Sequence, residues 1–263
     1  MSNPNLVALK TIARREVARI LRIWGQTLVP PAITMTLYFL IFGNLIGSRI
    51  GTMDGISYMD FIVPGLVMMA IIQNAYGNIS SSFFGAKFGR HVEELLVSPM
   101  PNWVILGGYV AGGVLRGLMV GAIVMVIAMF FTPVRLPHPL ITLATVILGA
   151  VIFSLAGFVN AVYAKKFDDI AIVPTFILTP LTYLGGVFYS VKLLPDWAQV
   201  LTHANPIFYM VNAFRYGLLG TSDPHRNVVT QALGVTDPAH LNVSMTAGEL
   251  RPGMQLLLCS DGL

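Results

Sequence analysis

Five long apolar runs dominate the sequence, and they limit the chain to folds that a lipid bilayer can hold. Each run is about 18 to 28 residues long, which is enough for a helix to cross the hydrocarbon core of a membrane. The runs are Val29 to Ile46, Phe61 to Ile79, Val104 to Phe131, Leu140 to Val162 and Ile170 to Tyr189. The sequence therefore predicts an all-α integral membrane protein with about five transmembrane helices.

The charge content argues against a water-soluble domain. Charged residues make up only 11% of the 263 residues and mean hydropathy is +0.73, whereas an average soluble domain carries about 25% charged residues. The net charge of +4 does not indicate nucleic acid as a partner, because the basic residues lie at the ends of apolar runs and form no continuous patch. The single cysteine, Cys259, excludes an internal disulfide and a multi-cysteine metal site, and no cofactor is expected.

Lysine and arginine are distributed unequally between the connections. One set of connections holds Lys10, Arg14, Arg15, Arg19, Arg22, Lys87, Arg90, Lys165 and Lys166, and the other holds Arg49, Arg135 and Lys192. Cytoplasmic connections carry the excess of basic residues. We therefore expect the N-terminus, the second-to-third loop and the fourth-to-fifth loop in the cytoplasm. Residues 1–26 lack the pattern of a cleaved signal peptide, so the first span is expected to direct insertion.

Residues 1–28 form a separate amphipathic segment. Its apolar side chains recur on one face of a helix, and its basic side chains lie largely off that face. We interpret it as a helix on the cytoplasmic lipid surface, in preference to an ordinary soluble helix, because a span follows at once. Pro30 and Pro31 are expected to mark the change of direction into that span.

The segment 193–220 has a broken helical pattern. Pro195 and Pro206 interrupt it, and the polar residues His203, Asn205, Asn212 and Arg215 argue against a sixth span. Its many aromatic residues are of the kind that settles at the membrane interface. We predict interfacial or re-entrant helices at the end of a transmembrane domain of residues 29–220. Residues 221–263 read as a small non-membrane tail.

The loop of residues 80–101 combines a short amphipathic segment with charged residues. Its chemistry suits docking, with Leu95 and Leu96 as anchors and Glu93 and Glu94 pairing with basic residues of a cytoplasmic partner. A solvated loop that only holds topology explains the pattern equally well. No Walker A motif occurs anywhere in the chain, so any ATP would have to be bound by another subunit.

Small and polar residues mark the predicted spans. Gly113, Gly117 and Gly121 are spaced by four, which allows close helix packing either within the chain or across a homodimer. Arg116 lies near the middle of the same span and should face a partner, a cavity or water. Four further polar residues either line a substrate route or form interhelical hydrogen bonds. These four residues are Gln73, Asn74, Thr179 and Tyr183.

Three stretches resemble the ABC-2-type permease family. They are DFIVPGLVMMAIIQNAYGNI at the second span, VEELLVSPMP after it, and the long segment PTFILTPLTYLGGVFYSVKLLPDWAQVLTHANPIFYMVNAFRYGLLG from Pro174 to Gly220. The resemblance covers about 220 residues. It implies a permease bundle, a homodimer or pseudo-dimer, and an ABC ATPase that clasps each permease through a coupling helix.

The resemblance also implies roles for particular residues. Carried over by position, the coupling helix falls at about residues 84–98, with contacts from Arg90, Glu93, Glu94, Leu95 and Leu96. The implied function is that of a non-enzymatic permease subunit that exports a drug, lipid or glycan-type substrate of hydrophobic or amphipathic character. A secondary transporter or channel is the alternative, but it normally needs several ionisable groups within the spans.

The resemblance stops near Gly220, where the family continues with a sixth span that is missing here. The segments HRNVVTQALG and LRPGMQLLLCSDGL instead resemble PP2C-type protein phosphatases, in which the residue matching Asp261 is a metal ligand. The other acidic motifs of that two-metal site are absent, so no phosphatase activity is expected. A join near this point, natural or artificial, leaves a non-functional permease–phosphatase chimera as a further alternative.

Overall fold

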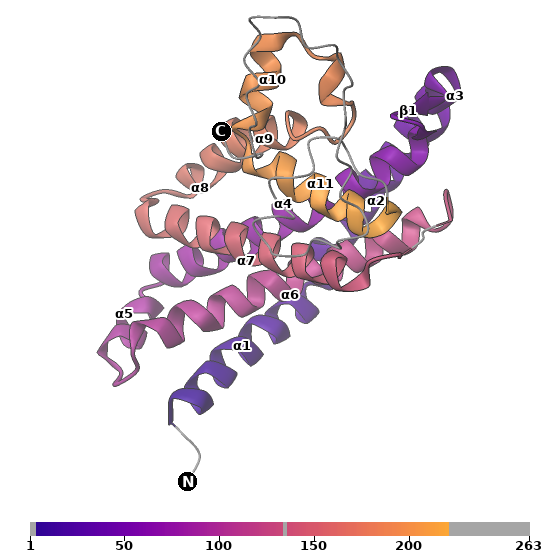
Figure 1. The fold of residues 1–263 in the computed structure, drawn as a ribbon. Helices are drawn as coiled ribbons and strands as arrows, with labels where there is room; N and C mark the ends of the chain where they lie inside the picture. Colours follow the sequence, from indigo (N-terminus) through magenta and orange to yellow (C-terminus); the bar gives the residue numbers. More distant parts are fainter. Residues whose placement is uncertain (1–3, 134–135, 221–263) are drawn as a thin grey trace, which may run out of the picture.

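A computed structural model of the chain describes residues 4–133 and 136–220, and this part is almost entirely helical (Figure 1). One short antiparallel hairpin pairs Thr52 with Ser57 and Met53 with Ile56. The elements are α1 (Pro4–Arg22), α2 (Trp24–Tyr38), η1 (Phe39–Ile46), α3 (Gly47–Ile50), β1 (Thr52–Met53), β2 (Ile56–Ser57), α4 (Tyr58–Phe88), α5 (His91–Val97), α6 (Asn102–Ala128), α7 (Pro139–Tyr163), α8 (Phe167–Val173), η2 (Pro174–Leu178), α9 (Thr179–Tyr183), η3 (Val191–Leu193), α10 (Asp196–His203) and α11 (Pro206–Leu219).

In the described part of the chain, four helices are long and apolar enough to cross a membrane. They are the run Trp24–Ile50, which joins α2, η1 and α3, and the helices α4, α6 and α7. This confirms the predicted all-α membrane fold. Helix α4 packs against both α6 and α7. The short helix α5 lies at one end of this bundle, and α3 and β1 lie at the other (Figure 1).

The fifth predicted span is shorter than the sequence suggested. Helices α8, η2 and α9 form one run from Phe167 to Tyr183, whereas the apolar pattern extended to Tyr189. The run ends because the chain turns at Gly186, whose φ of +68° is accessible to glycine without steric penalty. At 1.5 Å per residue the run is about 26 Å long, slightly less than a hydrocarbon core of roughly 30 Å. The fifth crossing therefore stays a prediction.

The break between the amphipathic helix and the first span also differs from the prediction. Helix α1 ends at Arg22, and the chain bends at Ile23, whose φ of −112° and ψ of 31° are not helical. The expected bend at Pro30 and Pro31 was wrong, because both prolines lie inside the continuous helix α2. Membrane helices tolerate interior proline where side chains and local adjustments satisfy the freed carbonyl groups.

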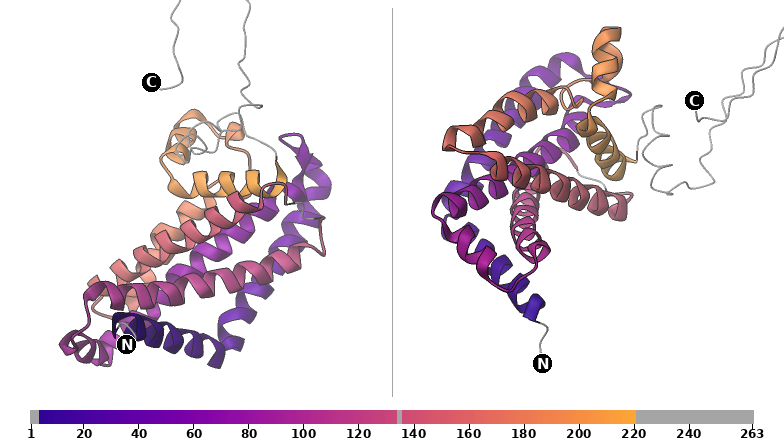
Figure 2. Two further views of the ribbon diagram at one scale, coloured as in Figure 1. Left: turned by 60° about the horizontal axis from the view of Figure 1, so that its bottom comes forward. Right: turned by 90° about the vertical axis from the view of Figure 1, so that its left-hand side faces the viewer.

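Helix α4 is the centre of the fold. Of its most apolar stretch, 89% is buried inside the protein, against at most 39% for the other three membrane helices. One buried cluster surrounds the first two thirds of α4, and a second surrounds Phe83 and Phe84 near α5. Two further views show α1 lying along α6 (Figure 2). Both parts of α4 are therefore packed into the core of the molecule.

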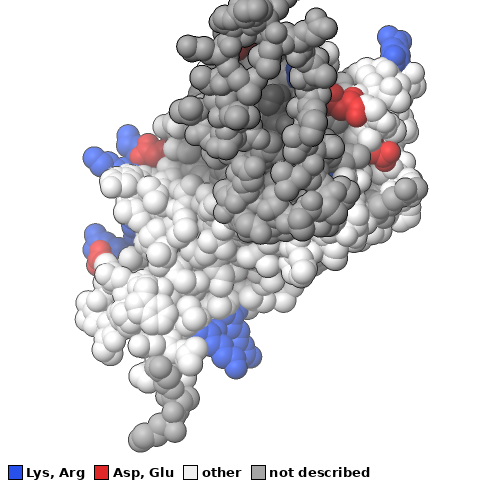
Figure 3. Space-filling model, in the orientation of Figure 1, with Lys and Arg blue, Asp and Glu red and all other residues white. Residues whose placement is uncertain are grey.

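Most exposed charged side chains lie near the two ends of the bundle, whereas Glu16 and Arg215 are buried within it and Arg116 is half-buried. The space-filling view shows Lys and Arg gathered around the end with α1 and α5, while the white surface that extends from there toward the opposite end shows almost no charges (Figure 3). At the opposite end, Lys192 Nζ and Asp54 Oδ1 are 3.7 Å apart and join η3 to the hairpin. A surface with almost no charged side chains between two charged ends is the pattern of a protein that spans a bilayer.

Candidate coupling surface and intramembrane polar residues

Helix α5 leaves the end of α4 through a tight turn. Arg90 adopts a left-handed conformation with φ of +60°, which is uncommon for a residue other than glycine. Its backbone N–H donates to the carbonyl of Lys87 at 3.1 Å, and the N–H of Glu93 donates to the carbonyl of Arg90 at 3.2 Å. The turn holds α5 in contact with α4.

The two faces of α5 differ in character. Val92 and Leu95 pack against the buried cluster around Phe83 and Phe84. The opposite face is exposed and mixes charged with apolar side chains. We call this face the coupling surface, and it consists of Arg90, Glu93, Glu94, Leu96 and Val97. The side chain of Val97 is 87% exposed and that of Leu96 is 61% exposed. Leu95 is half-buried and attaches α5 to the bundle, and its contact with a cytoplasmic partner stays a prediction.

Contacts with the connection between α7 and α8 hold the end of α4 in place. Lys87 Nζ donates to the carbonyls of Val162 at 2.6 Å and Ala164 at 2.8 Å, where a cation is favoured by the helix dipole. The ring centroid of Phe167 lies 5.0 Å from that of Phe84 and 4.9 Å from that of Phe88. The end of α4 that carries α5 is therefore attached to the end of α7 and to α8.

The start of α8 is held by a carboxylate. Asp169 Oδ2 accepts the backbone N–H groups of Lys165 at 2.8 Å and Lys166 at 2.9 Å. These two hydrogen bonds stabilise the charged form and lower the pKa of Asp169 below its ordinary value. Asp169 is therefore charged at neutral pH, the form that accepts both N–H groups.

The predicted glycines of α6 lie at its contacts with other helices of the same chain. A Cβ atom on Gly113 would lie 2.5 Å from Ser154 Oγ on α7 and 3.1 Å from the carbonyl oxygen of Ala75 on α4. Gly117 and Gly121 approach Ile71 of α4 just as closely. These distances leave no room for larger residues and explain the spacing of four by packing within one chain.

The predicted polar residues fall into two separate groups. Arg116 Nη2 donates to Asn74 Oδ1 at 3.4 Å, which joins α6 to α4. Tyr183 OH lies 3.1 Å from Tyr38 OH, which joins α9 to α2, and Thr179 donates to the carbonyl of Pro174 within its own helical run. Gln73 precedes Asn74 on α4 and is half-buried. Among the described residues, no hydrogen bond joins the two groups.

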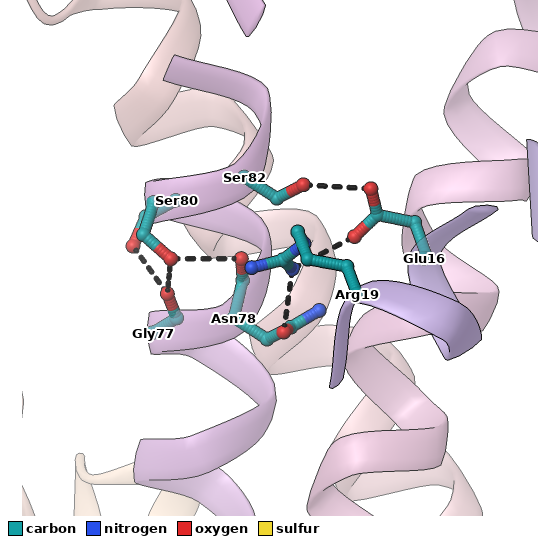
Figure 4. Close-up of polar contacts among 7 residues, drawn as sticks. Glu16, Arg19, Gly77, Asn78, Ser80 and Ser82 are labelled. Atoms are coloured by element: carbon teal, nitrogen blue, oxygen red, sulfur yellow. Dashed lines mark hydrogen bonds and ion pairs between the residues drawn. The ribbon is translucent and has the colours of Figure 1, made fainter. Parts of the chain in front are cut away.

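A polar cluster that was not predicted from the sequence lies between α1 and α4 (Figure 4). Glu16 is 3% exposed. Its Oε2 accepts from Arg19 Nη2 at 2.8 Å, and its Oε1 accepts from Ser82 Oγ at 2.7 Å. Arg19 Nη2 also donates to Asn78 Oδ1 at 2.8 Å. Arg19, predicted to lie off the apolar face at the lipid surface, therefore joins two helices.

A signal for this cluster was present in the sequence. Glu16 is the only acidic residue in the amphipathic segment, and it lies in line with Ile12 and Ile20 at helical spacing. A carboxylate on the apolar face of a basic helix indicates a buried partner, because an unpaired buried charge is strongly unfavourable. The partner itself could not be predicted, because Asn78 and Ser82 are more than fifty positions away.

The remaining prediction concerns Asp261, which lies outside the described residues, as does the whole PP2C-like segment. Within residues 4–133 and 136–220, no group of three or more His, Cys, Asp or Glu side chains is arranged to hold a metal ion.

Comparisons with known proteins agree with this architecture. The profile of the ABC-2 type transporter family matches residues 7–219. The Escherichia coli (strain K12) protein named inner membrane transport permease YadH is 64% identical over 217 residues, which cover 82% of this chain and 85% of that protein. Nodulation protein J of Sinorhizobium fredii (strain NBRC 101917 / NGR234) is 27% identical over 185 residues, or 70% of each chain.

Proposed function

Because the chain belongs to the ABC-2 type transporter family, we propose that it is the membrane subunit of an ATP-driven exporter. It is a multi-pass protein of the inner membrane and, like the relatives named as transport permeases, it acts as a permease subunit and not as an enzyme. Membership of this family implies an ABC ATPase partner. In our proposal the N-terminus and α5 face the cytoplasm, where this partner binds and hydrolyses ATP.

The coupling surface is the observation that supports this proposal most directly. It exposes two carboxylates beside two apolar side chains, and a basic groove lined with apolar residues complements that combination. Helix α5 follows α4, whose end is held against the α7–α8 connection by Lys87. A displacement of α5 by the ATPase would therefore move the end of α4, the most buried membrane helix. Closure of the ATPase would in this way favour one conformation of the bundle over another.

The transport route is proposed to lie between two copies of the permease. Within one chain, the outer surfaces of α2, α7 and the α8–α9 run carry exposed apolar side chains such as Ile33, Leu148 and Phe176. Lipid or a second copy can cover such surfaces. We propose export of a hydrophobic or amphipathic substrate along this homodimer interface, with Tyr38 and Tyr183 among the polar groups that line it.

Charge reversal on the coupling surface tests the proposal. The double variant Glu93→Lys, Glu94→Lys should abolish co-purification with an ABC ATPase encoded by a neighbouring gene, because the new lysines repel a basic groove. The measurement is the yield of ATPase that co-elutes with the tagged permease after co-expression. Membrane insertion should not change, since both side chains are exposed.

The matched control reverses an exposed charge at the other end of the molecule. Asp196→Lys at the start of α10 should leave the ATPase yield unchanged. An undiminished yield with the double variant would show that α5 is not the docking element.

A further inference from the structure

Two arginines from different helices meet the same face of α4. Arg19 of α1 donates to Asn78 Oδ1 at 2.8 Å, and Arg116 of α6 donates to Asn74 Oδ1 at 3.4 Å. Asn74 and Asn78 are one helical turn apart, so their side chains are neighbours on the helix surface.

Several donors at this place have no acceptor. The Nε atoms of Arg19 and Arg116 and the Nδ2 atom of Asn78 are buried, and they have no hydrogen-bond partner among the described residues. Asn78 itself is completely buried. Buried polar groups are normally hydrogen-bonded, and an unsatisfied set therefore requires an explanation. Three donors that lack an acceptor at one place indicate an acceptor-rich ligand.

The charge balance gives the sign of that ligand. Among the described residues, Glu16 supplies the carboxylate at this place, and it pairs with Arg19. Arg116 has an uncharged amide as its hydrogen-bonding partner. One positive charge is therefore left uncompensated near the middle of a membrane helix, where such a charge is costly. An anion would neutralise the charge and accept the free N–H groups, and guanidinium groups match phosphate and carboxylate in geometry.

We propose that Arg19, Arg116 and Asn78 form a binding site for the anionic group of an amphipathic molecule, either the transported substrate or a lipid. The ligand is a phosphate or carboxylate carried on an apolar body. This inference deepens the proposed function by assigning a charge to the substrate class.

A lipid-binding experiment tests the site in the full-length chain. The purified protein in dodecyl maltoside is titrated with fluorescent NBD-labelled phosphatidic acid, and binding is followed by fluorescence anisotropy. NBD-labelled phosphatidylcholine, which is zwitterionic, serves as the control lipid. Loss of one charge-assisted contact is expected to weaken binding by about tenfold or more. Arg19→Gln and Arg116→Gln should each show this loss for phosphatidic acid and no change for phosphatidylcholine.

Arg49→Gln is the matched control variant, because Arg49 is an exposed arginine at the opposite end of the molecule. It should bind phosphatidic acid like the unmodified protein. If Arg116→Gln does not elute as a folded species from a sizing column, Arg116→Lys carries the test. Lysine keeps the charge and loses the planar fork, so an intermediate affinity is expected.

Competition with inorganic phosphate tests whether the apolar body of the ligand is needed. We expect millimolar phosphate to leave the bound lipid in place, and displacement of the lipid would show a site for a free anion and would overturn the amphipathic ligand. Equal binding of the two lipids, or binding of phosphatidic acid that neither arginine affects, would overturn the proposal. No ATPase is present in this assay, so its failure would leave the proposed coupling role of α5 untouched.

Discussion

Arg215 shows how a charged side chain is held inside a largely apolar bundle. Its Nη2 donates to the carbonyl of Gly186 at 2.9 Å, its Nη1 donates to Asn212 Oδ1 at 2.8 Å and its Nε donates to the carbonyl of Phe61 at 3.3 Å. The guanidinium carbon also lies 3.9 Å from the centroid of the Phe61 ring. The residue therefore joins α11, the turn after α9 and the start of α4.

Replacement of this arginine should be strongly destabilising. Arg215→Met fills a similar volume but removes the three hydrogen bonds to Phe61, Asn212 and Gly186, which we expect to lower the free energy of unfolding by on the order of 3 kcal/mol. The readout is the thermal unfolding midpoint of the purified protein in detergent. Arg49→Met, at an exposed arginine, should leave that midpoint unchanged. Equal midpoints for the two variants would show that the Arg215 contacts do not contribute.

At the scale of residues, the sequence indicated which polar residues make contacts inside the bundle, but it did not indicate most of their partners. Arg116 was expected to face a partner, a cavity or water, and it contacts Asn74, also among the predicted residues. The role of Glu16 was missed, although its place on the apolar face of α1 marked it. The interaction of Tyr183 with Tyr38 depends on how α9 meets α2. The spacing of residues along one helix does not show which face of another helix it packs against.

At the scale of elements, the apolar runs located helices well and their ends poorly. An apolar run reflects the hydropathy of the side chains, but a helix ends where the backbone dihedral angles leave the helical region of φ/ψ space. Ile23 and Gly186 make those breaks through their dihedral angles, and neither interrupts an apolar pattern. Pro30 and Pro31 looked like breaks and are not, because helix α2 continues through them.

The packing of α6 on its neighbours gives a prediction at this scale. Gly113→Ala should lower the unfolding free energy by about 1–3 kcal/mol, because the added methyl overlaps Ser154 and approaches the backbone of α4. Gly77→Ala on α4 is the matched control, since a Cβ atom there meets nothing within 4 Å. It should be neutral or stabilising by up to about 1 kcal/mol.

Thermal unfolding of the two alanine variants in detergent measures this difference. A Gly113→Ala protein as stable as the Gly77→Ala protein would mean that α6 and α4 separate more easily than the structure shows. The comparison uses the same substitution at two membrane helices, so differences in helix propensity cancel.

At the scale of the molecule, the proposed orientation gives the last prediction. Val97 on the coupling surface and Leu193 beside α10 lie at opposite ends of the bundle, and both are well exposed, at 87% and 71%. In a Cys259→Ser background, Leu193→Cys should react with a membrane-impermeant maleimide in intact spheroplasts. Val97→Cys should react only after lysis, because Lys87, Arg90 and the basic face of α1 keep that end in the cytoplasm. Labelling of Val97→Cys in intact spheroplasts would place α5 on the outer side, where no ATPase could dock, and the coupling mechanism would fail with it.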